Sequence, residues 1–139
     1  MCQLGHLFVV SFKKRIHMDL INESDEEILK IANPVMNNLM DASTSNDFER
    51  HVRDFSDRIK EKYTQEEFQE QCEEYRSKWG VFTDREFIGT TKNKNIVNVY
   101  WKQRFSETDN EFLAVLTLSQ QDGQYTVERV FVDLWQLES

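Results

Sequence analysis

Glycine, proline and cysteine are scarce in this chain of 139 residues, which has four, one and two of them. The chain has no Gly-rich phosphate loop and no G-x-S-x-G nucleophile motif. Cys2 and Cys72 belong to no C-x-x-C or Cys/His cluster, and His6, His17 and His51 share no ligand spacing. We therefore expect reduced thiols in a cytoplasmic protein, with no metal and no cofactor.

Long basic stretches and long apolar stretches are also missing. The densest basic run, residues 13–15, is too short to offset a net charge of −8, which repels nucleic-acid phosphates and anionic lipids. The apolar segment "LGHLFVVSF" is about half the length needed to span a bilayer, and its basic residues follow it, unlike those of a signal peptide. We expect no nucleic-acid partner, no membrane association and no secretion.

Residues 1–17 are interpreted as an upstream extension or a poorly ordered arm, because Met18 opens "MDLINESDEE", a typical start. The alternative is a segment that docks on the body through its apolar residues. No internal repeat or low-complexity linker follows Met18. Residues 18–139 are therefore predicted to form one domain, and ten Phe, four Tyr and three Trp supply apolar area for its core.

The first predicted helix starts at a capping box formed by Ser24 and Glu27. Apolar residues then recur at helical spacing, at positions Ile28, Ile31, Ala32, Val35, Met36 and Leu39. Pro34 interrupts this stripe, and we expect it to kink the helix or to split it in two.

Two further amphipathic helices are predicted before residue 80. Ser45 or Asn46 caps the second, a break is possible at residues 56–57, and its apolar face consists of Phe48, Val52, Phe55 and Ile59. Thr64 and Glu67 form a capping box for the third, which carries Phe68, Cys72, Tyr75 and Trp79. Gly80 supplies a left-handed C-terminal cap.

After Gly80 the apolar periodicity changes to two residues, and β-branched and aromatic residues dominate. The predicted strands are residues 81–91, 96–106, 112–119 and 125–135, joined by the short turns "KNKN", "ETDN" and "QQDGQ". Short connections between strands of similar length favour an antiparallel meander. The predicted fold class is α+β, with three helices packed on a curved four-stranded antiparallel sheet.

This order of elements, with the segments "NDFERHVRDFSDRIKEKYTQEEFQE", "KWGVF", "NVYWKQRF" and "EFLAVLTLSQQDGQYTVERVFV", resembles the cystatin-like cone of the nuclear transport factor 2-like superfamily. It looks most like small prokaryotic branches of unknown function. The likeness covers about residues 20–135. It implies a bent sheet that wraps its helices and leaves a pocket open at one end, where members hold catalytic acids, ligands or partners.

The weak catalytic candidates are Asp133 and His51. If Val127 and Phe131 point inward, Asp133 points inward with them, and apolar surroundings would raise its pKa. In the opposite phase Asp133 is an ordinary surface carboxylate. His51 lies one position off the apolar stripe of the second helix, where edge-of-core packing outweighs a general-base role.

Five residues are candidates for binding a ligand. Trp101 and Gln103 belong to the more apolar phase of the second strand, and Gln103 there could bind a ligand or satisfy a buried backbone group. The others are the aromatic residues Tyr75, Trp79 and Phe131.

The last two strands carry apolar residues in both phases, which indicates that both faces of the sheet are covered. We expect a homodimer through the outer sheet face, with the N-terminal arm as the competing cover. The predicted function is that of a domain that binds a small apolar molecule or a protein partner, with no demonstrated catalysis. The alternatives are a cofactor-free isomerase, dehydratase or hydrolase that uses a pocket carboxylate, and a structural dimerisation module.

Overall fold

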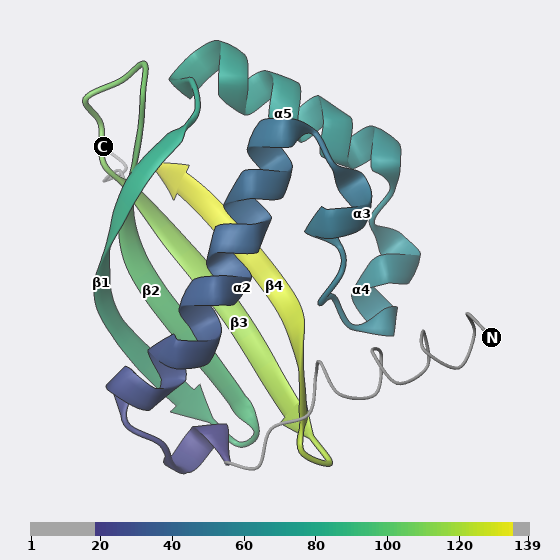
Figure 1. Cartoon of the computed structure of the whole chain (residues 1–139), viewed down its shortest axis with the longest axis vertical. Coiled ribbons are helices and arrows are strands. Elements are labelled where there is room, and N and C mark those ends of the chain that lie inside the picture. The colour runs from purple at the N-terminus through teal and green to yellow at the C-terminus, as the bar shows by residue number, and fades with distance from the viewer. Residues whose placement is uncertain (1–18, 135–139) are drawn as a thin grey trace, which may run out of the picture.

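The computed structural model describes residues 19–134, so the expectations for residues 1–17 lie outside the described residues. Helices cover one face of a four-stranded antiparallel sheet, as the sequence predicts (Figure 1). A 3-10 turn, Leu20–Asn22, precedes the elements α2 (Asp25–Ser45), α3 (Phe48–His51), α4 (Asp57–Lys62), α5 (Gln65–Trp79), β1 (Phe82–Asn93), β2 (Ile96–Phe105), β3 (Phe112–Gln121) and β4 (Gln124–Leu134).

Helix α2 begins after Ser24, whose hydroxyl accepts a hydrogen bond from the Glu27 amide at 3.2 Å. The helix continues through Pro34 as one element of 21 residues, so it is not split. Proline removes the hydrogen bond to the Lys30 carbonyl, and both Pro34 and Lys30 are exposed, so water can satisfy that carbonyl.

The second predicted helix consists of two short helices, α3 and α4. Neither Ser45 nor Asn46 caps α3, because Ser45 is the last residue of α2 and Asn46, in the left-handed region with φ 56°, is its C-cap. The cap of α3 is Asp47, whose carboxylate accepts a hydrogen bond from the Arg50 amide at 3.2 Å. The break before Asp57 is confirmed.

The segment between α3 and α4 pairs with the edge of the sheet. The Ser56 amide donates to the Val127 carbonyl at 3.1 Å, and the Val127 amide donates to the Asp54 carbonyl at 2.7 Å. Phe55 and Val127 thus form a short parallel bridge. This pairing covers part of an edge of β4 that would otherwise be exposed.

Helix α5 has the predicted boundaries. The Thr64 hydroxyl and the Glu67 carboxylate form a complete capping box at its start. Gly80 ends it with φ 87° and ψ −141°, a backbone conformation that favours glycine but differs from the predicted left-handed helical cap. The chain then enters β1, and α5 comes to lie beside α2 at one end of the sheet (Figure 1).

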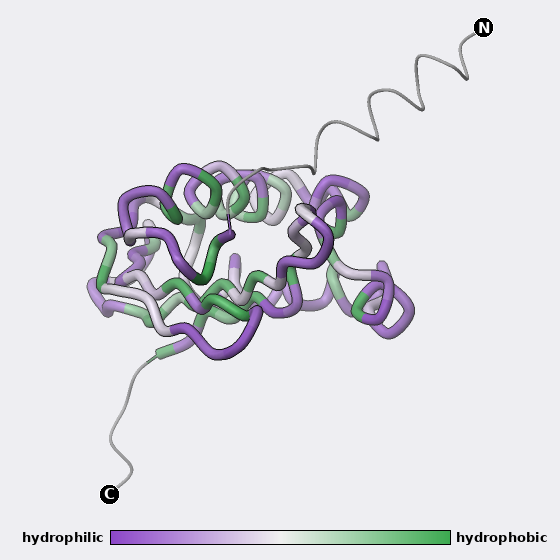
Figure 2. The backbone as a smooth tube through the Cα atoms, turned by 90° about the horizontal axis from the view of Figure 1, so that it is seen from below, coloured by the Kyte–Doolittle hydropathy of each residue, from purple (hydrophilic) through white to green (hydrophobic). Residues whose placement is uncertain are grey.

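The strands form a meander in the order β1-β2-β3-β4. Figure 2 shows the two layers, with the helices on one side and the sheet on the other. Side chains between the layers form the core, and those of the two central strands are Val97, Val99, Trp101, Phe105, Phe112, Ala114, Leu116 and Leu118. The helical side contributes mainly the apolar stripe of α2.

Strand β4 contains a β-bulge at Glu128, because Thr117 pairs with Arg129 whereas Leu118 pairs with Val127. Side chains of a strand point alternately to its two faces. The extra residue shifts this alternation by one position, so the other set of side chains faces the helices after the bulge.

On either side of the bulge, Val127 and Val132 are both buried, although simple alternation places them on opposite faces. Phe131 and Asp133 consequently face away from the core, and both are exposed. By simple alternation, the apolar residues of β4 would lie on both faces of the sheet. Because of the bulge, some of them lie together on the inner face.

Candidate functional site

Two small cavities adjoin each other where α2, α5 and β4 meet, and we call this region the α2–α5 cleft. Their volumes are about 50 Å³ and about 60 Å³, and both are bordered by Met40, Ser43, Cys72, Tyr75 and Val132. The centre of the domain is filled instead by core side chains, such as Trp101 and Leu116, with at most 1% of their surface exposed. These two cavities therefore lie at the α5 end of the domain.

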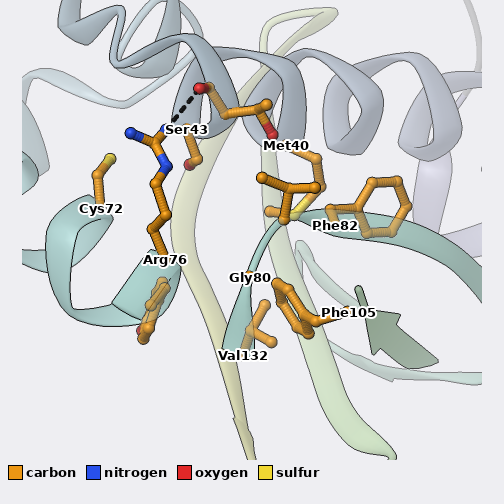
Figure 3. A pocket seen from close by; sticks show the side chains of 11 residues that line it. Met40, Ser43, Cys72, Arg76, Gly80, Phe82, Phe105 and Val132 are labelled. Atoms are coloured by element: carbon orange, nitrogen blue, oxygen red, sulfur yellow. Dashed lines mark hydrogen bonds between the residues drawn. The ribbon is translucent and has the colours of Figure 1, made fainter. Parts of the chain in front are cut away.

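The first cavity lies next to the corner between α5 and β1. Arg76 reaches across from α5 and donates a hydrogen bond from Nη2 to the Thr44 carbonyl of α2 at 2.7 Å (Figure 3). Phe82 and Phe105 form part of the apolar lining. Arg76 thus connects the two helices beside a largely apolar space.

Cys72 and Tyr75 keep their protons at neutral pH. Burial raises the pKa of the Cys72 thiol above its ordinary value, although the Arg76 charge acts in the opposite direction. Burial also raises the pKa of the Tyr75 hydroxyl, and the negative charge of Asp133 adds to this effect. A protonated, buried thiol is a poor nucleophile, so Cys72 serves as an apolar wall.

His51 lies in an aromatic cluster beside the second cavity. Its ring centroid is 4.7 Å from that of Phe68, 5.4 Å from that of Phe55 and 5.9 Å from that of Tyr63. The residue is 7% exposed, and burial lowers its pKa to about 4 despite a hydrogen bond with the Leu39 carbonyl. His51 is therefore uncharged at neutral pH and is part of the core.

Gln103 is completely buried on the inner sheet face, near the end of the central strand β2. Its Nε2 donates to the Met40 sulfur at 3.2 Å, and its Oε1 has no partner among the described residues. Gln103 thus lies directly beneath one of the side chains that border both cavities.

The remaining candidates lie at different places. Trp79 packs on Phe105 and Phe112 and stacks on Tyr75 with ring centroids 4.8 Å apart, so it supports the cleft without bordering it. Trp101 is buried and borders a separate hollow. Phe131 borders the second cavity at the sheet edge, with 37% of its surface exposed.

Asp133 faces solvent, so the inward orientation that a catalytic role requires is not realised. The bulge at Glu128 is the physical reason, because it reverses the facing of every later residue in β4. The Asp133 carboxylate accepts a hydrogen bond from the Leu134 amide at 2.8 Å.

Sequence reasoning missed Met40, Ser43, Arg76 and Val132 as cleft residues. Met40 carries a signal, since it follows Met36 by four residues on the apolar stripe of α2. Arg76 and Ser43 carry no such signal in the sequence, because each is one polar residue among many on a helix. Only the packing of α2 against α5 selects them.

Two other hollows are more open. One, of about 560 Å³, lies between α4 and the β3–β4 turn, where Glu128 is bound by Arg58 at 2.8 Å and by Ser56 at 3.0 Å. The other, of about 420 Å³, is bordered by Arg85, which donates to Asn37 at 2.6 Å and lies over the rings of Phe82 and Trp101. Glu128 and Nη2 of Arg85 already bind within the protein, whereas Nε of Arg85 has no hydrogen-bond partner among the described residues.

Fold and cleft together define a small α+β protein with an antiparallel meander covered by helices on one face. Among solved structures it is similar to a SEC-C motif containing protein from Rhodopseudomonas palustris, with a TM-score of 0.50, 12% identity, and 70% of this chain and 74% of that chain covered. It is also similar to Bd1075 from Bdellovibrio bacteriovorus, with a TM-score of 0.49 and 11% identity. That match covers 83% of this chain and 44% of the other.

At such low identity the likeness to the Rhodopseudomonas palustris protein shows the fold alone. No protein-family model and no curated protein matches the sequence. None of the helices between residues 19 and 134 is long and apolar enough to cross a membrane. Within the same part of the chain, no group of His, Cys, Asp and Glu side chains is arranged to hold a metal ion.

Proposed function

We propose that this protein binds a small, largely apolar molecule in the α2–α5 cleft and does not transform it. The observation that carries the proposal is the pair of adjoining cavities that share five lining residues. Each cavity alone has room for only water or a group of a few atoms. Met40 borders both, and its unbranched thioether side chain can change rotamer readily, so its displacement would join them into a ring-sized site.

The chemistry of the lining supports binding more than catalysis. His51 is neutral and packed among aromatic rings, and the thiol of Cys72 and the hydroxyl of Tyr75 are held in their protonated forms. A general base or nucleophile needs the opposite conditions. The buried free thiol of Cys72 also agrees with the cytoplasmic location that we propose.

Membership of the nuclear transport factor 2-like superfamily is part of the same proposal. In that family the sheet bends around the helices and leaves a pocket at one end. The position of the α2–α5 cleft at one end of this domain agrees with that arrangement.

The proposal is tested by titrating toluene, as a small apolar probe, into ¹³C-methyl-labelled protein. We expect the methyl resonances of Met40 and Val132 to shift in a saturable manner. Met40→Ala should strengthen binding because it opens the cleft, and Val132→Phe should abolish it because it fills the cleft. Ile88→Phe adds a ring at a site that is 59% exposed and should leave binding unchanged. Unperturbed cleft resonances at saturating toluene in both wild type and Met40→Ala would refute the proposal.

We propose separately that two copies associate through the outer sheet face. Tyr100, Val115 and Phe131 form one row across this face, and Arg129 and Asp133 flank Phe131 on β4. A two-fold axis near Phe131 would place Arg129 of one copy opposite Asp133 of the other. Sedimentation at micromolar concentration should show a dimer, and Phe131→Glu should give a monomer. A monomeric wild type would eliminate this proposal and leave ligand binding unaffected.

A further inference from the structure

Arg85 is a partly buried cation at the junction between β1 and α2. Its guanidinium carbon lies 5.5 Å from the ring centroid of Phe82 and 5.3 Å from that of Trp101. Its Nη2 donates hydrogen bonds to the Asn33 carbonyl at 3.2 Å and to Oδ1 of Asn37 at 2.6 Å. Two rings and two oxygen acceptors thus hold the planar guanidinium in one orientation.

Among residues 19–134 no carboxylate forms an ion pair with the Arg85 guanidinium, whose hydrogen bonds both go to neutral acceptors. Asp84 and Glu86, its near neighbours in sequence, bind Arg104 instead, at 3.3 Å and 2.8 Å. Burial lowers the pKa of Arg85 below its usual value, and the charge of Asp41 acts in the opposite direction without cancelling this effect. A partly desolvated cation without a counter-ion costs free energy.

The guanidinium lies at the open hollow of about 420 Å³ that Arg85 borders, because all four residues that contact it border the same hollow. Nε is closed off from solvent, so no ligand can reach it. Nη1 also has no hydrogen-bond partner among the described residues, but it is not closed off in this way. Nη1 is therefore an accessible donor with unused hydrogen-bonding capacity.

The border of this hollow favours an anion, although the chain has a net charge of −8. Arg85 is its one charged residue, and no acidic residue borders it. The other residues of the border are Asn33, Asn37, Phe82, Phe87 and Trp101. Phe87 has 37% of its surface exposed, so it offers an apolar wall next to the cation. The combination of one cation, amide groups and aromatic rings is typical of a site for a small organic anion.

We propose that this hollow binds a small organic carboxylate with a flat apolar body, and that a carboxylate oxygen accepts a hydrogen bond from Nη1 of Arg85. The side-chain amides of Asn33 and Asn37 supply further N–H donors at the same border. The apolar body of the ligand lies against the Phe87 ring. This site shares Phe82 with the first cavity of the α2–α5 cleft but is otherwise separate from the cleft, so the inference goes beyond the proposed function.

The first test compares benzoate with benzamide, which has nearly the same shape but no charge, by titration into ¹⁵N-labelled wild type. Benzoate should shift the Phe87 amide and the Trp101 indole resonances in a saturable manner. Benzamide should bind at least about tenfold more weakly, because a charged acceptor forms the stronger hydrogen bond. Equal affinities, or no saturable shift with benzoate, would overturn this proposal. Toluene binding in the α2–α5 cleft tests the proposed function independently of either result.

The second test measures the benzoate affinity of variants. Arg85→Met should weaken benzoate binding at least about tenfold and change benzamide binding by less than about twofold. Lys62→Met removes the same charge at an exposed position on α4 and should leave the benzoate affinity unchanged. Equal losses in these two variants would show that only the overall charge matters and would overturn the proposed site.

Asn37→Asp keeps the proposal testable if Arg85→Met fails to fold. The new carboxylate lies where Oδ1 of Asn37 now accepts from Nη2 of Arg85, so it supplies the missing counter-ion from within the chain. The variant should bind benzoate about tenfold more weakly, because the two carboxylates repel each other and compete for one cation. Benzoate affinity equal to that of wild type would contradict the pairing with Arg85.

Discussion

The side-chain amide of Gln103 lies against the sulfur of Met40, with Nε2 and Sδ 3.2 Å apart, and this contact connects the last part of strand β2 to the second half of α2. A thioether is a weak hydrogen-bond acceptor. The other amide atom, Oε1, has no partner among the described residues. Gln103 is therefore a buried amide whose hydrogen-bonding capacity is largely unused.

Gln103→Met should raise the free energy of unfolding by about 1 kcal/mol, because it removes an unsatisfied polar group and keeps the volume of the side chain. Gln103→Ala is the control for volume and should lower the same free energy by ~2 kcal/mol, since it leaves a cavity. Urea denaturation measures both values. A clear loss of stability in Gln103→Met would mean that the amide has a partner in solution.

His51 should make stability depend on pH. Its pKa is lowered from 6.5 to about 4 in the folded protein, mainly by burial, so between these values only the unfolded chain takes up the proton. The contribution of His51 to the free energy of unfolding is therefore fully present above pH 6.5. It is lost as the pH drops toward 4, by roughly 3 kcal/mol in total.

This dependence is isolated by comparing wild type with His51→Phe in urea denaturation at pH 7, 6, 5 and 4.5. The carboxylates titrate in both proteins, so the difference between the two curves reports on His51. Parallel curves would show that the imidazole becomes protonated inside the folded domain.

Gly80→Ala should destabilise the domain by about 2 kcal/mol or more. Gly80 has φ +87°, and a Cβ there would lie 2.3 Å from Ser106 Oγ and 2.5 Å from Glu107 Cγ. Gly89→Ala is the matched control, because no atom lies within 4 Å of the added carbon. Thermal unfolding should separate the two variants, and equal melting temperatures would refute the conformational requirement at Gly80.

Thr64→Ala should cost ~1 kcal/mol by removing the N-terminal cap of α5. The Thr64 hydroxyl accepts from the Glu67 amide at 3.1 Å, and the Glu67 carboxylate accepts from the Thr64 amide at 3.0 Å. Thr64→Ser retains the hydroxyl and should keep nearly full stability. Equal losses of free energy of unfolding in the two variants would show that the methyl group matters more than the cap.

Features that depend on neighbours in sequence were predictable. The starts of α2 and α5 follow from Ser24 and Thr64, because a capping hydroxyl bonds an amide only three residues away. The four strands and their antiparallel order follow from short turns between segments of alternating apolar residues. The end of α5 at Gly80 follows from the tolerance of glycine for positive φ.

The orientation of Asp133 was not predictable, because one extra residue at Glu128 reverses the facing of the rest of β4. The apolar residues change phase there, from Tyr125 and Val127 to Val130 and Val132, but Phe131 continues the earlier phase and masks the change. Edge-of-core packing was predicted for His51, but the contact of its ring with Phe68 was not, because it depends on how α3 packs against α5.

The sequence by itself determined the class of this fold, its helix caps and its meander, since each depends on contacts within a few residues or on a repeating apolar pattern. Only the tertiary structure decided where the cavities lie and which side chains border them. The α2–α5 cleft depends on the distance between two helices and a strand that are far apart in the chain. No local pattern encodes such a distance, because it results from how all the core side chains pack together.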